Sequence, residues 1–200
     1  MKKLLSLILL LSFTIKAQEI KIGTQTWTTK NLDVTKYRNG DAIPQVQDKN
    51  AWAKLKTGAW CYYENKTANG TTYGKLYNWF AVNDTRGLAP KGYHIPTDAE
   101  WAILTDYLGG DSIAGAKIKS TSGWEENGNG SNTSGFAGLP GGCRFNLGYF
   151  SFIGGYGSWW SSSEGDAANA WYRDLSSSDG TVDGDNDDKH SGFSVRCLRD

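Results

Sequence analysis

Short aromatic runs separated by glycine fill the second half of the chain, and they constrain its fold more than any other feature. After Ser120, segments rich in Trp, Tyr and Phe alternate with Gly, Ser and Asn. Such a pattern is typical of short antiparallel strands joined by glycine turns. The runs lie at residues 136–139, 149–153, 158–161, 170–175 and 192–198. The pattern excludes a coiled coil or a collagen-like fibre and favours a loop-rich globular fold in which aromatic side chains fill the core.

Helix signals lie between residues 73 and 118. Leucine and aromatic side chains recur between residues 73 and 80 at the spacing of one helix face, which predicts a helix there. Residues 97–100 (TDAE) have the pattern of a capping box that begins a second helix, and the glycines at 109 and 110 end it. A short third helix is expected over residues 113–118. Strands together with two or three helices indicate the α+β class.

Other segments of the first half are expected to form a hairpin, a strand and loops. Residues 20–27 surround a Gly-Thr pair and predict a short hairpin, and the aromatic neighbours of Cys61 predict a strand. Polar, turn-rich composition predicts loops over residues 37–48 and 64–72. Neither a linker nor an internal repeat divides the chain, so residues 19–200 are expected to form a single domain.

The first segment has the layout of a secretory signal peptide. Lys2 and Lys3 precede a mainly apolar stretch over residues 4–15, and the small residue Ala17 suits a cleavage site. The apolar stretch is shorter than the ~20 residues that a membrane span needs. Residues 1–18 are therefore interpreted as a signal peptide, with no transmembrane segment after cleavage and a secreted or cell-surface protein as the product.

Charge disfavours a nucleic-acid partner. Removal of the signal segment also removes Lys2, Lys3 and Lys16, which leaves 18 Lys and Arg against 21 Asp and Glu. The remaining chain is slightly acidic and has no basic run that could follow a phosphate backbone.

Export permits disulfides, and the three cysteines allow one bridge. Cys61 and Cys197 both lie in strand-like segments, so a Cys61–Cys197 bridge is favoured. A bridge through Cys143 and three free buried thiols are the alternatives. A metal site built on cysteine has little support because no CxxC pair is present and the two histidines lie far apart in sequence.

The chain resembles the Fibrobacter succinogenes major paralogous domain, a family of secreted bacterial proteins. Ordered motifs across almost all of residues 19–200 carry the resemblance. They are KIG (21–23), QTW (25–27), NL (31–32), RNGD (38–41), WCYY (60–63), YGKLYNW (73–79), GLAPKGYHIPT (87–97), EW (100–101), LPGG (139–142), WWSSSE (159–164) and GFSVRC (192–197).

The resemblance implies a C-type-lectin-like fold, distantly similar to the branch shared with formylglycine-generating enzymes. Paired terminal strands, two helices and a long irregular second half would follow from it. It implies no reaction, since no cysteine pair here matches a formylglycine-generating site. Relatives more often carry an aromatic residue at the position of Cys143, which supports Cys143 as the unpaired thiol.

The acidic run over residues 179–188 (DGTVDGDNDD) is a candidate Ca²⁺ site. Asp183, Asp185 and Asp187 alternate along it, and hard carboxylate ligands suit Ca²⁺. The run does not match an EF-hand, because Asp188 and Ser194 stand where that loop needs Gly and Glu. The competing interpretation is a solvated loop between two strands, so no cofactor is strictly expected and Ca²⁺ is the one candidate.

Aromatic and polar residues of the same region form the candidate ligand site. Trp and Tyr rings stack on the apolar faces of sugars, although most aromatic residues serve a core. The candidates are Tyr156, Trp160, Trp171, Tyr172, Asn186 and His190. They predict a non-enzymatic binding or adhesion module for a polysaccharide or a surface protein. An enzyme related to the formylglycine-generating proteins, acting through a Cys or a metal, and a purely structural surface protein are the alternatives.

Overall fold

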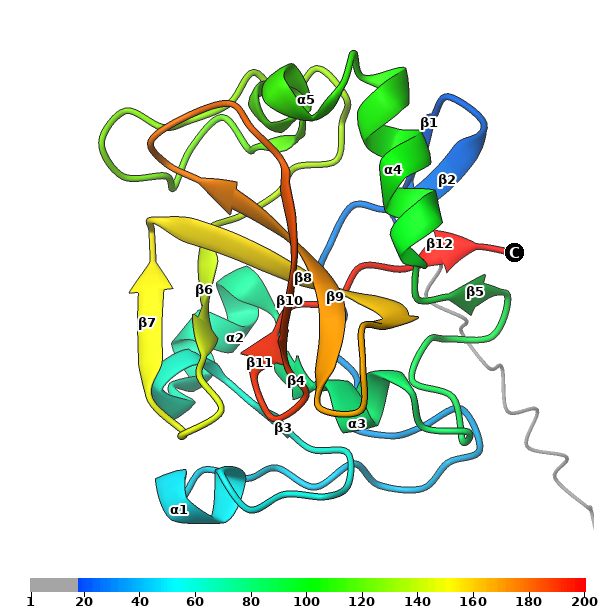
Figure 1. Cartoon of the computed structure of the whole chain (residues 1–200), viewed down its shortest axis with the longest axis vertical. Coiled ribbons are helices and arrows are strands. Elements are labelled where there is room, and N and C mark those ends of the chain that lie inside the picture. Colours follow the sequence, from blue (N-terminus) through cyan, green and yellow to red (C-terminus); the bar gives the residue numbers. More distant parts are fainter. Residues whose placement is uncertain (1–17) are drawn as a thin grey trace, which may run out of the picture.

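The computed structural model describes residues 18–200. It contains a four-stranded sheet and an eight-stranded sheet, with helices around them (Figure 1). The predicted signal peptide falls on residues 1–17 and the adjoining Gln18, so it lies almost wholly outside the described residues. The mixed α+β class expected from the sequence is confirmed.

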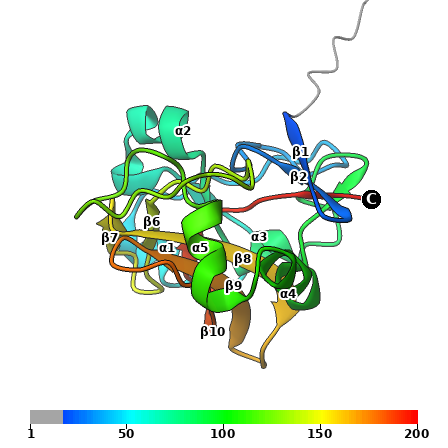
Figure 2. The same cartoon turned by 90° about the horizontal axis from the view of Figure 1, so that it is seen from above.

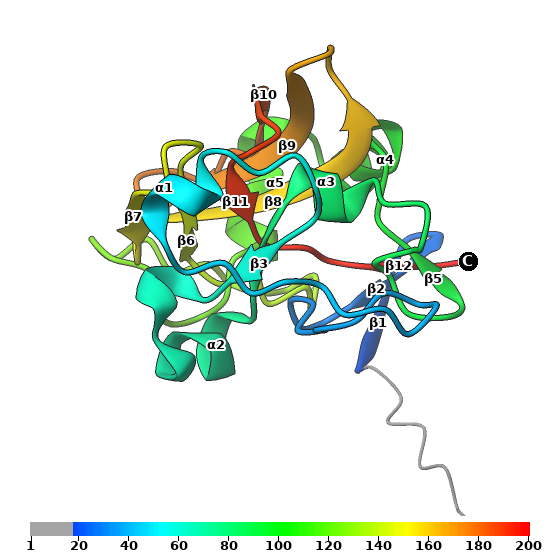
Figure 3. The same ribbon diagram turned by 90° about the horizontal axis from the view of Figure 1, so that it is seen from below.

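The small sheet joins the two ends of the described chain. It contains β1 (Glu19–Ile22), β2 (Gln25–Thr28), β12 (Leu198–Arg199) and β5 (Tyr93–His94), in the order β1-β2-β12-β5. Gly23 turns the first hairpin with a φ of +60°, a conformation that glycine adopts without strain. Figure 3 shows the C-terminal chain crossing from β11 in the large sheet to β12 beside β2.

The large sheet carries most of the second half of the chain. Its order is β10-β9-β8-β6-β11-β4-β3, and β7 pairs with β6 outside this path. The pairings are antiparallel except between β6 and β8. Its strands are β3 (Trp60–Cys61), β4 (Leu76–Asn78), β6 (Gly141–Arg144), β7 (Phe150–Ile153), β8 (Tyr156–Glu164), β9 (Asn169–Ser176), β10 (Asp183–Asp188) and β11 (Gly192–Phe193).

Five α-helices lie around these sheets in the part of the chain that the structure describes. They are α1 (Lys49–Trp52), α2 (Thr67–Tyr73), α3 (Trp79–Val82), α4 (Asp98–Tyr107) and α5 (Asp111–Ile118), with a 3-10 turn at Tyr63–Asn65. Seen from above, α4 and α5 lie together over the β8–β9 pair (Figure 2). This number exceeds the two or three helices expected. The additional helices are among α1, α2 and α3, which are too short to leave a clear periodic pattern in the sequence.

Helix α4 begins where the sequence predicts. The Thr97 hydroxyl accepts a hydrogen bond from the Glu100 N–H, and the Glu100 carboxylate accepts one from the Thr97 N–H at 2.8 Å. The capping box therefore satisfies two end N–H groups reciprocally.

The predicted helix over residues 73–80 is wrong. Residues 76–78 form β4 between β3 and β11, with a helix on either side. All three β4 residues are buried, so apolar side chains occupy both faces of a short central strand. In a short apolar run, the sequence pattern of a strand that is buried on both faces cannot be told from that of a helix. The loop expected over 64–72 is likewise replaced in part by α2.

The predicted Cys61–Cys197 bridge is absent. All three cysteines are free and buried. Cys61 lies opposite Leu76 and packs with it in one core cluster, whereas Cys197 packs with Tyr77 in another. Because neighbouring strand residues point to opposite faces, the two thiols lie on different sides of β4.

Aromatic side chains fill most of the core. One cluster under α4 and α5 contains Trp27, Trp101, Phe136 and Trp159, with ring centroids 4.8–6.0 Å apart. The fully buried Arg196 lies against Phe136 and donates to the carbonyls of Thr28, Phe136 and Ala137. Most of the aromatic excess in the sequence is therefore used for packing. No helix within residues 18–200 has the length and apolar character needed to cross a bilayer.

Candidate functional site

A cavity of about 190 Å³ opens among β7, β8, β9 and β10, and we call it the acid–aromatic pocket. Aromatic rings supply most of its walls and two carboxyl groups lie among them. Its lining residues are Cys143, Phe145, Phe152, Tyr156, Ser158, Tyr172, Asp174, Asp187 and Phe193. Its volume is below the ~300 Å³ at which pockets for drug-sized ligands begin, so it suits one small unit of a ligand.

Strand alternation places these side chains on one face. Tyr156 and Ser158 are two residues apart in β8, and Tyr172 and Asp174 are two apart in β9. In the register, Ser158 lies opposite Asp174. Side chains two apart in a strand point the same way, and directly opposed residues share a face. The β8–β9 pair therefore presents an aromatic ring and a carboxyl group to the same cavity.

Three partly exposed rings form the mouth of the pocket. Phe145 and Phe152 have centroids 5.8 Å apart, and Phe152 and Tyr156 have centroids 5.0 Å apart. Phe152 is 49% exposed, a large fraction for a phenylalanine. Its φ of +70° is also rare for a bulky residue, and such strain persists where the surrounding fold imposes it, often at binding sites.

The inner wall is aromatic as well. Tyr172 packs on the buried Phe193, with centroids 4.8 Å apart. Burial raises the pKa of the Tyr172 hydroxyl, and the nearby Asp174 raises it further, so this group stays neutral. The pocket thus offers ring faces at its mouth and a neutral phenol deeper inside.

Asp174 has the most altered acidity in the pocket. Burial raises its pKa to about 7, and the carboxylate of Asp183 adds to the rise. A hydrogen bond of 2.7 Å from the Ser158 hydroxyl opposes the rise. Burial also raises the pKa of Asp187, with Asp188 contributing. Carboxyl groups with raised pKa values in a cleft are typical of functional sites.

Cys143 lines the pocket without the properties of a nucleophile. It is 4% exposed, and burial raises the pKa of its thiol to about 12. A reactive cysteine needs the opposite change, because the thiolate is the attacking species. No histidine lines the pocket either.

The predicted Ca²⁺ ligands are not brought together. Asp183, Asp185 and Asp187 lie on β10, which is an edge strand and not the loop that the acidic run suggested. Within residues 18–200, no group of three or more His, Cys, Asp or Glu side chains could hold a metal ion. Asp183 and Asp187 are four residues apart in β10, roughly 13 Å along an extended strand, which is too far for both carboxylates to lie about 2.4 Å from one ion.

The six predicted ligand residues do not form one site. Tyr156 and Tyr172 line the pocket. Trp160 is fully buried and its indole N–H donates to the carbonyl of Tyr77, so it is a core residue that a ligand cannot reach. Trp171 lies opposite Asn186 in the register, and both point away from the face that holds Tyr172.

His190 belongs to a separate local structure. Its ring lies 2.7 Å from the Asp188 carboxylate and meets the edge of the Phe80 ring, with centroids 5.1 Å apart. Sequence reasoning missed Phe145, Phe152 and Asp174. Only the alternation of Tyr172 and Asp174 within one run could have indicated that a ring and an acid share a face.

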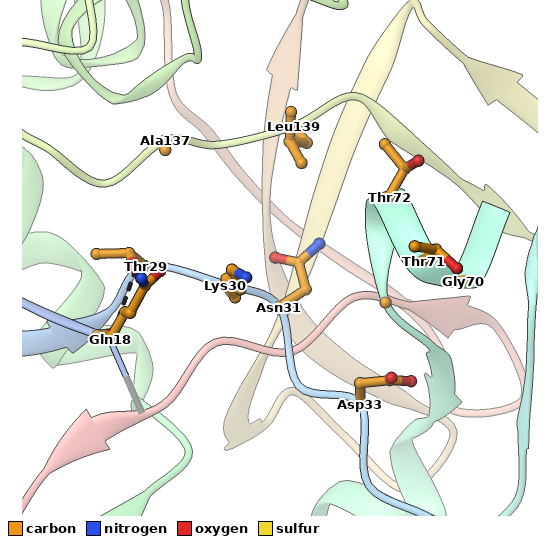
Figure 4. A pocket seen from close by; sticks show the side chains of 11 residues that line it. Gln18, Thr29, Lys30, Asn31, Asp33, Gly70, Thr71, Thr72, Ala137 and Leu139 are labelled. Carbon is orange, nitrogen blue, oxygen red and sulfur yellow. Dashed lines mark hydrogen bonds between the residues drawn. The ribbon is translucent and has the colours of Figure 1, made fainter. Parts of the chain in front are cut away.

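A larger groove of about 600 Å³ lies between α2 and the segment after β2 (Figure 4). Asn31 stands at its centre and joins four groups: its amide donates to the Tyr73 carbonyl and the Ser194 hydroxyl, and its oxygen accepts from Trp159 and Arg196. Asp33 pairs with the buried Lys75. The side chains of Asn31 and Asp33 are thus engaged in holding the fold, and no aromatic ring lines the groove.

Comparison with known families gives one match. The model of the Fibrobacter succinogenes major domain matches residues 20–199, almost the whole described chain. No curated protein matches it. The acid–aromatic pocket and the large sheet lie wholly inside the matched region, and only Gln18 of the groove and Glu19 of β1 fall outside it.

Proposed function

The chain belongs to the Fibrobacter succinogenes major domain family, and from that premise we propose that it is a non-enzymatic binding module of the bacterial cell surface. In this proposal the acid–aromatic pocket holds one sugar unit of a polysaccharide. The observation that carries the proposal is the set of partly exposed rings of Phe145, Phe152 and Tyr156 around a small cavity that contains carboxyl groups.

The chemistry of the lining suits a sugar. A pyranose has apolar C–H faces and a rim of hydroxyl groups, so it matches a site that has both ring faces and hydrogen-bond acceptors. The rings of Phe152 and Tyr156 would stack on the apolar face. The Asp174 and Asp187 carboxyl groups would accept from hydroxyls. The small cavity would take one unit, and the rest of the polymer would extend over the exposed Leu147 and Tyr149.

Location and fold enter the same proposal. The signal-peptide pattern of residues 1–18 supports secretion or display on the cell surface. A C-type-lectin-like fold is supported by the pairing of β2 with β12, which brings the two ends of the matched region side by side. A cysteine enzyme is less well supported, because the pKa of the Cys143 thiol is raised and not lowered. A purely structural protein would leave the exposed rings without a role.

A glycan array and titration with the full mature chain test the proposal. The wild type should retain at least one bacterial or plant polysaccharide fragment, and Phe152→Ala and Tyr156→Ala should each weaken binding about tenfold or more, as the loss of about 1.4 kcal/mol would. Tyr107→Ala is the matched control, because Tyr107 is 65% exposed on α4 and lies outside the pocket lining.

Three results would overturn the proposal. The first is an array without any ligand, and the second is binding that the three variants reduce equally while their thermal melts remain native. The third is the release of new reducing ends from a bound glycan, which would make the protein an enzyme.

A further inference from the structure

We propose that the acid–aromatic pocket selects a positively charged amine, so that the unit it binds is an amino sugar with a free ammonium group. The inference rests on the binding site proposed above and adds the chemical class of its ligand. The pocket is an open cavity with aromatic walls, and the carboxyl groups in its lining determine which kind of ligand charge would complement it.

The lining contains two carboxyl groups and no basic partner for them. Asp174 and Asp187 are its only carboxylic acids, and no Lys, Arg or His is among its nine residues. The nearest basic side chains along β9 and β10 are engaged elsewhere: Arg173 pairs with Asp98 on α4, and Lys189 pairs with Glu164. A cationic ligand would therefore supply the charge that the pocket lacks.

The rings of the pocket are also free of internal cations. In the described part of the chain, Lys and Arg side chains lie over the rings of other aromatic residues. Lys49 lies 3.9 Å from the centroid of Tyr149, and Arg144 lies 4.3 Å from that of Trp52. None of these cation–π contacts uses a ring that lines the pocket.

Aromatic faces combined with carboxylates are a chemical environment that favours organic ammonium groups. A cation near a ring face is attracted by the negative face of the π system, and the attraction grows when the site is desolvated. Phe152 and Tyr156 supply ring faces at the mouth, while Asp174 and Asp187 supply carboxyl groups with raised pKa values, which a bound cation would ionise. A neutral sugar would use the rings but would not stabilise the ionised carboxylates.

The acidity of Asp174 agrees with this geometry. Asp183 and Asp179 both act on it, and Ser158 donates to it. Burial is the largest cause of the raised pKa of Asp174, the two carboxylates add to it, and the hydrogen bond from Ser158 opposes it. A bound cation would favour the ionised carboxylate, so binding should release a proton and strengthen as the pH rises through about 7.

Isothermal titration of the full mature chain with D-glucosamine, N-acetyl-D-glucosamine, D-glucose and tetramethylammonium tests the inference. At neutral pH, glucosamine should bind at least about tenfold more tightly than the two neutral sugars, a difference of about 1.4 kcal/mol. Tetramethylammonium stays charged at every pH, so its binding at pH 5.5 and pH 8 reports the protein's own groups. It should bind more tightly at pH 8.

Asp174→Asn and Asp187→Asn should each remove the preference for glucosamine while binding of glucose is retained. Asn at position 174 can still accept from Ser158, so the fold should persist, which a thermal melt checks. Asp106→Asn is the matched control, because Asp106 is exposed on α4.

The outcomes separate this inference from the proposed function. Equal binding of glucosamine and glucose, unchanged by Asp174→Asn, would overturn the inference and leave the sugar site standing. Binding of tetramethylammonium without any sugar would overturn the sugar site and retain the ammonium site. Absence of binding by all four probes would overturn both.

Discussion

Replacement of Asp174 by Asn should stabilise the protein, and the gain should grow with pH. Burial raises the pKa of Asp174 from 3.8 to about 7. Between these two values the folded protein retains a proton that the unfolded chain has lost. The free energy of unfolding therefore falls as the pH rises through this window and levels off above it. Asn has no charge to bury, so the variant lacks this loss.

The shift sets the size of the effect. A rise of about three pKa units corresponds to about 4 kcal/mol, at about 1.4 kcal/mol for each unit. We expect Asp174→Asn to exceed the wild type by up to this amount at pH 8 and by much less at pH 4.5. The side-chain oxygen of Asn can still accept the hydrogen bond from Ser158, so the substitution should change little besides the buried charge.

Urea denaturation followed by tryptophan fluorescence, at pH 4.5 and pH 8, measures the difference. Asp106→Asn serves as the exposed control and should show no such dependence. A difference between Asp174→Asn and wild type that is equal at the two pH values would refute the reasoning. Stabilisation together with loss of ammonium binding would show that Asp174 is kept for function at a cost in stability.

Three further predictions concern other parts of the fold. Asn31→Ala should lower the free energy of unfolding by about 3 kcal/mol, because it leaves the buried N–H donors of Trp159 and Arg196 without their acceptor; a urea titration showing less than about 1 kcal/mol would contradict this. Burial disfavours the charged form of His94, but hydrogen bonds to the carboxylates of Asp200 and Glu100 outweigh burial and raise the pKa of the imidazole. The stability that charged His94 adds is therefore complete below pH 6.5 and declines at higher pH. His94→Asn should thus cost up to about 1 kcal/mol at pH 5.5 and less at pH 8.5, and a pH-independent cost in urea titrations would speak against this ion pairing. Burial raises the pKa of all three cysteine thiols to about 12, so mass spectrometry should find three alkylated cysteines after non-reducing denaturation and almost none in the native protein; a pair that resists labelling would reveal a disulfide.

Local sequence determined the features that depend on neighbouring residues. The capping box of Thr97 and Glu100 begins α4 because both of its hydrogen bonds join groups three residues apart. The glycine turn at Gly23 produces the first hairpin in the same way. The mixed α+β class and the family also follow from the order of short motifs along the chain.

Tertiary structure decided which face each strand residue occupies and therefore where the site lies. Trp160 and Tyr172 are opposed in the register and share a face, yet Trp160 is fully buried in the core and Tyr172 lines the pocket. The difference arises because β9, which carries Tyr172, lies beside the edge strand β10, whereas β8 lies one strand further in. Tertiary pairing also explains why residues 76–78 form a strand between β3 and β11, and why Cys61 and Cys197 lie on different sides of that strand. The sequence determines which side chains alternate along each strand. Only the pairing of strands far apart in the chain determines which side is filled by the core and which is left open to a ligand.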